Sequence, residues 1–212
     1  MKLILITYPK AIPNEAGLLV SMFEEGLTRL HIRKPGISID DLRKYIKAIP
    51  EQYHSCLMLH QHFELVNEFK LGGVSFNKKH PPCFDLLDGK GLIYAQSAHS
   101  MQELRALDER IDYALLSPIF DSISKDDYAS NFKNRTLLGE DLELFKKKNS
   151  TEVIALGGID KDNIHKVKYF GFHGSAVLGY VWRSVTKKDK PERAINKIKK
   201  LLEKCQDNAR YV

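Results

Sequence analysis

The sequence is poor in cysteine and contains no long apolar run. Its three cysteines, Cys56, Cys83 and Cys205, are odd in number and lie far apart in the chain. They form neither a disulfide framework nor a CxxC pair, so we expect reduced thiols in a cytoplasmic protein. No segment approaches the roughly 20 consecutive apolar residues that a membrane-spanning helix needs. We therefore expect no membrane partner.

Two further signals are missing near the N-terminus. The segment MKLILITYPK has an apolar run of only about six residues, shorter than that of a signal peptide, and it lacks a small-residue cleavage site. No GxGxxG turn follows it, which argues against a dinucleotide-binding open sheet. The segment is better interpreted as a first buried strand.

Basic residues outnumber acidic ones, and the formal net charge is +6. Much of the excess lies in residues 146–148 and 197–204. In the second region Ile195, Ile198 and Leu201 recur at helical spacing, which places the lysines on the solvated face of an amphipathic helix. No recognition motif accompanies the charge, so we expect no nucleic-acid partner.

Short apolar runs and helical patterns alternate along the 212 residues. Continuous apolar runs are typical of parallel strands buried on both faces, and their alternation with helices predicts a parallel sheet. We predict one α/β domain over residues 1–212, a single (β/α)8 TIM barrel. A doubly wound open sheet is the alternative. Asn14 and Ser38 are the expected N-caps of the first two helices. The expected strands are 3–7, 27–33, 56–60, 73–76, 92–97, 113–120, 153–156 and 175–178, and the expected helices are 15–25, 38–49, 62–69, 101–110, 136–148, 160–170 and 191–205.

In such a barrel the functional residues follow the carboxyl ends of the strands. Gly157 and Gly158 follow the seventh strand and precede a helix. Without Cβ atoms, their backbone can approach a ligand and direct N–H groups at phosphate oxygens, and the helix N-terminus adds positive potential. A tight turn without a ligand is the alternative. We predict a phosphate site here, completed by Gly179 at the end of the eighth strand.

Three polar side chains lie in the long stretch 121–135 that follows the sixth strand. Ser122, Ser124 and Lys125 supply two hydroxyls and a cation, which suit an anionic substrate group. Long loops of this kind are often lids, although a solvated polar loop is the alternative. Arg33, after the second strand, is expected to hold a phosphate or carboxylate, or else to form an ion pair across the barrel mouth.

Histidines are the remaining candidates for chemistry. His60 and His62 share the spacing of one strand face, but no third ligand accompanies them in a fixed pattern, so we expect no metal. His99, after the fifth strand, is the candidate acid/base because histidine titrates near neutral pH. A structural histidine at a helix cap or at the barrel rim is the alternative.

The chain resembles the superfamily of thiamine phosphate synthases and thiazole tautomerases. The resemblance covers nearly the whole chain and is most specific in LHIRK (30–34), SAHS (97–100), DYALLSPIFDSISK (112–125), VIALGGI (153–159) and GFHGSAVLGYV (171–181). It implies that a thiazole phosphate binds at Gly157, Gly158 and Gly179. It also implies that Ser122, Ser124 and Lys125 stand for the family's Thr-x-Thr-Lys segment, and that Arg33 matches the arginine of the diphosphate site.

The resemblance leaves three activities open. The synthase joins hydroxymethylpyrimidine diphosphate to thiazole phosphate and releases pyrophosphate with Mg²⁺, but the family's metal-binding residues fall on His60, Gln61 and His80. Neutral Gln and His are poor ligands for Mg²⁺. Our first expectation is therefore a cofactor-free thiazole tautomerase, with His99 moving the proton. The synthase is the alternative, with Mg²⁺, and a non-catalytic binder of thiazole phosphate is the third. The expected partner is a phosphorylated thiazole, and barrels of this size are often homodimers.

Overall fold

Eight parallel strands close into a barrel in which each strand pairs with its neighbours in chain order and β1 pairs with β8. The computed structural model describes residues 1–87, 91–121, 130, 132, 134–186 and 191–206. This architecture confirms the predicted (β/α)8 barrel and excludes the open sheet. The strands are β1 Lys2–Ile6, β2 Leu30–Ile32, β3 Leu57–Leu59, β4 Gly73–Phe76, β5 Ile93–Ala98, β6 Tyr113–Leu116, β7 Glu152–Leu156 and β8 Gly174–Val177.

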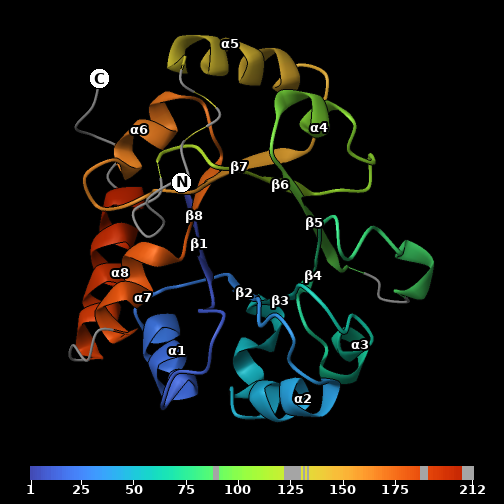
Figure 1. Cartoon of the computed structure of the whole chain (residues 1–212), viewed down its shortest axis with the longest axis vertical. Helices are drawn as coiled ribbons and strands as arrows, with labels where there is room; N and C mark the ends of the chain where they lie inside the picture. Colours follow the sequence, from blue (N-terminus) through green and yellow to red (C-terminus); the bar gives the residue numbers. More distant parts are fainter. Residues whose placement is uncertain (88–90, 122–129, 131, 133, 187–190, 207–212) are drawn as a thin grey trace.

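The described helices surround the barrel (Figure 1) and bury one apolar face each against it. None of them, within the described ranges, is both long and apolar enough to cross a membrane. The α-helices are α1 Glu15–Glu24, α2 Ile39–Lys47, α3 Leu65–Phe69, α4 Met101–Arg105, α5 Arg135–Lys146, α6 Ile164–Tyr169, α7 Gly179–Thr186 and α8 Glu192–Gln206, and two 3-10 turns cover η1 Glu51–Cys56 and η2 Phe84–Leu86.

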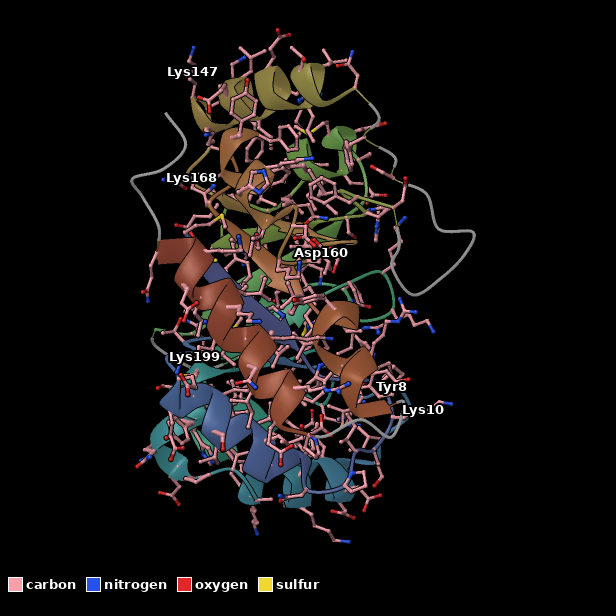
Figure 2. All side chains as sticks on the ribbon, turned by 90° about the vertical axis from the view of Figure 1, so that its left-hand side faces the viewer. Tyr8, Lys10, Lys147, Asp160, Lys168 and Lys199 are labelled. Atoms are coloured by element: carbon pink, nitrogen blue, oxygen red, sulfur yellow. The ribbon has the colours of Figure 1, made fainter. Side chains whose placement is uncertain are left out.

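Helix α8 carries one of the two lysine-rich stretches of the chain. Its buried positions, Ala194, Ile198, Leu201 and Cys205, follow the helical period. Lys199 is exposed on the opposite face and pairs with Glu25 at 3.0 Å (Figure 2). Lys199, Lys200 and Lys204 thus lie on the exposed side of an amphipathic helix, as predicted, whereas Lys197 is half-buried and donates to Tyr180 O at 2.6 Å.

The two expected helix caps behave differently. Ser38 caps α2, because its hydroxyl accepts a hydrogen bond from the Asp41 amide at 3.1 Å. Asn14 adopts a left-handed conformation with φ 52° and makes no side-chain cap bond. Its side chain instead lies against Gly17, where a Cβ atom would come within 2.7 Å of Asn14 Oδ1.

Two elements differ from the sequence prediction in ways that shape the site. Strand β6 ends at Leu116 rather than at residue 120, since Pro118 has no N–H to continue the ladder. The chain beyond it still bonds to the end of β7, with Ile119 N donating to Leu156 O at 2.9 Å. Helix α7 was not predicted. Its sequence has low helix propensity, and it is fixed by the buried Trp182, whose indole N–H donates to Ile6 O at 2.8 Å.

The seam between the first and last strands is reinforced at the chain's N-terminus. Strands β1 and β8 pair from Lys2↔Gly174 to Leu5↔Val177. The Met1 ammonium donates to Cys205 O in α8 at 3.1 Å. The β1–β8 pairing and the contact of Met1 with α8 together hold the barrel closed.

Candidate functional site

A cavity of about 570 Å³ opens at the carboxyl ends of the strands. This volume lies within the range of small-molecule sites, roughly 300–1,000 Å³. Its walls come from the ends of β1, β2, β3, β4, β5, β6, β7 and β8 and from the segments that follow them. Among the predicted site residues, Arg33, His99, Gly157, Gly158 and Gly179 all line it. Ser122, Ser124 and Lys125 lie outside the described residues.

Gly157 and Gly158 form a turn that no other residue type would fit. Their φ values are +102° and +64°, a region that L side chains rarely adopt. A Cβ on Gly157 would lie 2.9 Å from the Cα of Pro118. Their amides meet no acceptor in the part of the chain that the structure describes. The glycines therefore let the segment after β6 pack against the turn and leave two N–H donors at the cavity.

The start of α7 lies across the same end of the cavity. The amides of Val181 and Trp182 bond to Leu178 O, at 3.2 and 3.1 Å. Those of Gly179 and Tyr180 find no acceptor among the described residues, as expected in the first turn of a helix. Free amides and the helix dipole make this end favourable for an anion.

His99 is held in a defined orientation at the end of β5. Its Nδ1 lies 3.1 Å from Ser117 O, and its backbone N–H donates to Glu103 Oε2 at 2.8 Å. Nδ1 also lies 3.3 Å from Ser117 Oγ, a hydroxyl that can donate or accept. The shorter contact is to a carbonyl oxygen, which can only accept, so this arrangement favours the proton on Nδ1 and leaves Nε2 without one. His99 also lines the cavity, so this nitrogen is available to a ligand.

Three buried aromatic side chains form a hydrogen-bonded chain inside the barrel. Tyr113 Oη lies 2.5 Å from His31 Nε2, and His31 Nδ1 lies 2.9 Å from His60 Nε2. Burial lowers the pKa of His60 to about 3, helped by the charges of Arg33 and His80. Burial likewise lowers the pKa of His31 well below its usual value and raises that of Tyr113. All three are therefore neutral near pH 7.

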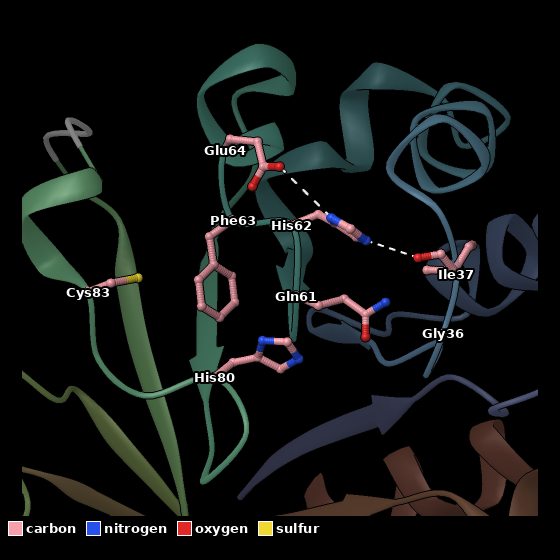
Figure 3. A pocket seen from close by; sticks show the side chains of 8 residues that line it. All are labelled: Gly36, Ile37, Gln61, His62, Phe63, Glu64, His80 and Cys83. Atoms are coloured by element: carbon pink, nitrogen blue, oxygen red, sulfur yellow. Dashed lines mark hydrogen bonds and ion pairs between the residues drawn. The ribbon is translucent and has the colours of Figure 1, made fainter.

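The His62 side chain, by contrast, lies outside the main cavity. Its Nε2 bonds to Ile37 O at 2.9 Å, and its Nδ1 lies 3.9 Å from Glu64 Oε1. Figure 3 shows these contacts in a second pocket, which shares Gly36, Gln61 and His80 with the main cavity. His60 and His62 thus do not face one another.

The Mg²⁺ ion implied by the family does not fit the residues at this position. Gln61 donates through its amide to Lys34 O at 2.8 Å, so only one neutral oxygen remains. No carboxylate belongs to the described lining of the main cavity. In the second pocket Glu64 points toward His62 and away from Gln61 (Figure 3). Mg²⁺ prefers carboxylate oxygens, and no cluster of three His, Cys, Asp or Glu able to hold a metal occurs among the described residues.

Basic side chains, rather than carboxylates, line this part of the cavity. Lys78 and Lys79 lie two and three residues after the end of β4 and line the cavity with Arg33. Lys78 also pairs with Glu103 at 3.0 Å. No role was predicted for these lysines from the sequence. Their place just after a strand end was the signal that could have found them.

A buried ion pair supports the β2 end of the site. Lys34 Nζ lies 2.6 Å from Glu15 Oε2, and both side chains are buried. The ammonium also donates to the carbonyl oxygens of Tyr8 and Lys10, at 2.7 and 3.1 Å. Burial raises the pKa of Glu15, although Lys34 opposes the shift. Lys34 thus ties the segment after β2, next to Arg33, to the loop after β1 and to the start of α1.

Known proteins share both the sequence pattern and the barrel. The model of a family described as thiamine monophosphate synthase matches residues 3–181. A thiamine-phosphate synthase of Clostridium acetobutylicum is 26% identical over 208 residues, 94% of this chain and 95% of that protein. The crystal structure of a thiamine phosphate pyrophosphorylase from Bacteroides thetaiotaomicron is 30% identical, with a TM-score of 0.83 and coverage of 99% and 100% of the two chains. The chain therefore belongs to the thiamine monophosphate synthase family.

Proposed function

We propose that this chain catalyses the synthase reaction, in which a hydroxymethylpyrimidine diphosphate and a thiazole phosphate are joined. The bond between the pyrimidine methylene carbon and the diphosphate oxygen breaks, a bond from that carbon to the thiazole nitrogen forms, and pyrophosphate leaves. The relatives named as synthases support this proposal over the tautomerase that we expected first.

The observation that carries the proposal is a cavity lined by two groups of residues suited to anions, one after β7 and β8 and the other after β2 and β4. The first group offers the amides of Gly157, Gly158 and Gly179. The second offers Arg33, Lys78 and Lys79. A reaction between two phosphorylated substrates needs two such groups, whereas an isomerase of one phosphorylated substrate needs only one.

Each group has a role in this reaction. The amides at Gly157, Gly158 and Gly179 would hold the thiazole phosphate, with Ser122, Ser124 and Lys125 as further proposed contacts. Arg33, Lys78 and Lys79 would hold the diphosphate and stabilise the charge that develops on it as it leaves. Because the residues present do not fit Mg²⁺, we assign no step to a metal.

A second candidate, the tautomerase reaction, is favoured by the orientation of His99. With Nδ1–H fixed on Ser117 O, its basic Nε2 could take a proton from a bound thiazole and return it elsewhere on the ring. Such a reaction would use the amides after β7 and β8 and leave the basic side chains idle.

The test is to incubate the purified protein with both substrates and measure thiamine phosphate and pyrophosphate, with EDTA or with Mg²⁺. Stoichiometric formation of both products supports the synthase. A parallel incubation supplies the thiazole carboxylate phosphate tautomer, and conversion of that compound without the joining reaction would select the second candidate. Tight thiazole phosphate binding without either reaction would reject both and leave a non-catalytic binder.

A further inference from the structure

Lys34 directly follows Arg33 but points away from the cavity. Arg33 is exposed and lines the cavity, whereas Lys34 is buried and does not belong to the described lining. The Lys34 ammonium has three N–H groups to donate, and it meets three acceptors. These are Glu15 Oε2 at 2.6 Å, Tyr8 O at 2.7 Å and Lys10 O at 3.1 Å. Every donor of the ammonium is thus used, and the side chain is held in one place.

Burying this group is energetically unfavourable. Burial raises the pKa of Glu15 even though Lys34 lies beside it, so the loss of hydration outweighs the attraction between the two charges. The Lys34 ammonium also lies 5.2 Å from the centroid of the Tyr45 ring, and burial raises the pKa of that phenol well above its usual value. Well-packed apolar side chains in place of a buried ion pair often leave stability unchanged or raise it. Stability alone therefore does not account for this cluster, and the neighbouring Arg33 offers another role for it.

The backbone at Arg33 is held from two sides, but its guanidinium is not. Arg33 N donates to Thr7 Oγ1 at 2.9 Å, and Thr7 Oγ1 donates to Arg33 O at 3.2 Å. The next carbonyl oxygen, that of Lys34, accepts from Gln61 Nε2 at 2.8 Å. The guanidinium itself makes no hydrogen bond or ion pair with the residues that the structure describes. Its direction therefore depends on how the backbone and the adjacent side chain are fixed, and fixing them in advance lowers the entropic cost of binding.

We propose that Lys34 is a positioning residue for Arg33: anchored to Glu15 and to the loop after β1, it fixes the direction in which Arg33 extends into the cavity. The inference rests on the proposed function only in assigning the diphosphate group to Arg33. An apolar side chain at position 34 could fill the same space but could not make three directional hydrogen bonds. Lys34 therefore acts on affinity for the diphosphate and leaves affinity for the thiazole phosphate unchanged.

The test combines Lys34→Met with Glu15→Leu and uses pyrophosphate as the probe, with calorimetry as the measurement. The double variant keeps the net charge and fills the space with apolar atoms, so urea unfolding should show a stability close to or above that of the wild type. Pyrophosphate affinity should nevertheless fall by about tenfold, as when one hydrogen bond to a charged group is lost. Thiazole phosphate affinity should not change. An unchanged pyrophosphate affinity would overturn the proposal.

Repeating the two substitutions in an Arg33→Ala background shows whether Lys34 acts through Arg33. If it does, the double variant loses no further pyrophosphate affinity in that background. Equal losses in both backgrounds would overturn the proposal, because Lys34 would then act independently of Arg33. An Arg33→Ala variant that binds pyrophosphate like the wild type would overturn it as well, and so would a wild type that does not bind pyrophosphate.

Two single variants keep the proposal testable if the double variant does not fold. Glu15→Gln retains an oxygen that accepts from the Lys34 ammonium and should keep most of the pyrophosphate affinity, whereas Lys34→Met removes all three donors and should lose it. Equal affinities of these two variants would contradict the positioning role. A wild type that binds pyrophosphate but forms no thiamine phosphate would reject the synthase reaction, while coupling between Lys34 and Arg33 would still support the inference.

Discussion

A Cβ atom on Gly158 would lie 2.3 Å from the carbonyl oxygen of Asp121. This close approach places the segment after β6 directly against the turn after β7. The segment after β6 and the turn after β7 thus depend on one another. The turn exposes its amides only while residues 118–121 keep their backbone conformation. A side chain at position 158 would displace that segment as well as strain the turn at φ +64°.

Gly158→Ala should therefore reduce both stability and thiazole phosphate affinity, the affinity by at least tenfold. Gly26→Ala is the matched control, since Gly26 also has a positive φ of 103° but nothing lies within 4 Å of its Cβ position. Thermal unfolding and calorimetry measure the two effects. Equal affinity losses in both variants would show that the turn does not hold the phosphate.

The buried pair of Lys34 and Glu15 should contribute far more to stability than exposed pairs do. Glu15→Ala leaves a buried ammonium without its counter-ion, which typically costs about 3–5 kcal/mol. The control is Glu68→Ala, which removes the exposed partner of Arg43, 2.8 Å away, and should cost little stability because exposed ion pairs are screened by solvent. Urea unfolding measures both. A similar loss in the two variants would contradict the structural role assigned to the buried pair.

Acid should destabilise the fold through the buried His31 and His60. The unfolded chain binds protons on His31 and His60 below about pH 6.5, whereas native His60, with a pKa of about 3, does not. Between those values stability therefore falls as pH falls, by roughly 1 kcal/mol per histidine from pH 7 to pH 5.5. Unfolding curves at several pH values measure the slope, and His60→Asn should make it shallower. An unchanged slope in that variant would show that His60 already titrates normally in the native barrel.

A substitution of His99 distinguishes the two candidate reactions. If the chain is a synthase, His99→Ala should lower pyrophosphate release by less than about tenfold, because the proposed transfer assigns no proton to this residue. If it is a tautomerase, the same change should lower turnover by roughly 10²–10⁴-fold, the usual contribution of a positioned acid/base. Thiazole phosphate affinity serves as the control and should change little. A synthase reaction abolished by His99→Ala would require a new assignment of roles.

Elements that follow from the periodicity of apolar residues could be predicted from the sequence. Elements whose stability depends on contacts between distant segments could not. The apolar runs at residues 3–7 and 153–156 became strands because both of their faces are buried. Helix α7 was missed because its stability comes from Trp182 reaching Ile6 O, a contact between segments far apart in the chain.

The same distinction holds within the site. Gly157 and Gly158 were predicted from their place after a strand, and both line the cavity. The link from Tyr113 to His60 could not be predicted, since it joins β6, β2 and the end of β3 through the barrel interior. Lys78 and Lys79 were not predicted as site residues, although they lie only two and three residues after the end of β4.

The pairing of β1 with β8 has a consequence for how the chain reaches its native state. Seven of the eight seams join consecutive strands, whereas this one joins Lys2 to Gly174. Pairing two strands so far apart in the chain has the largest entropic cost of loop closure, so we expect it late on the folding pathway. Until it forms, the edges of both strands remain unpaired and open to other chains. The interval before ring closure is thus when a nascent molecule is most exposed to aggregation.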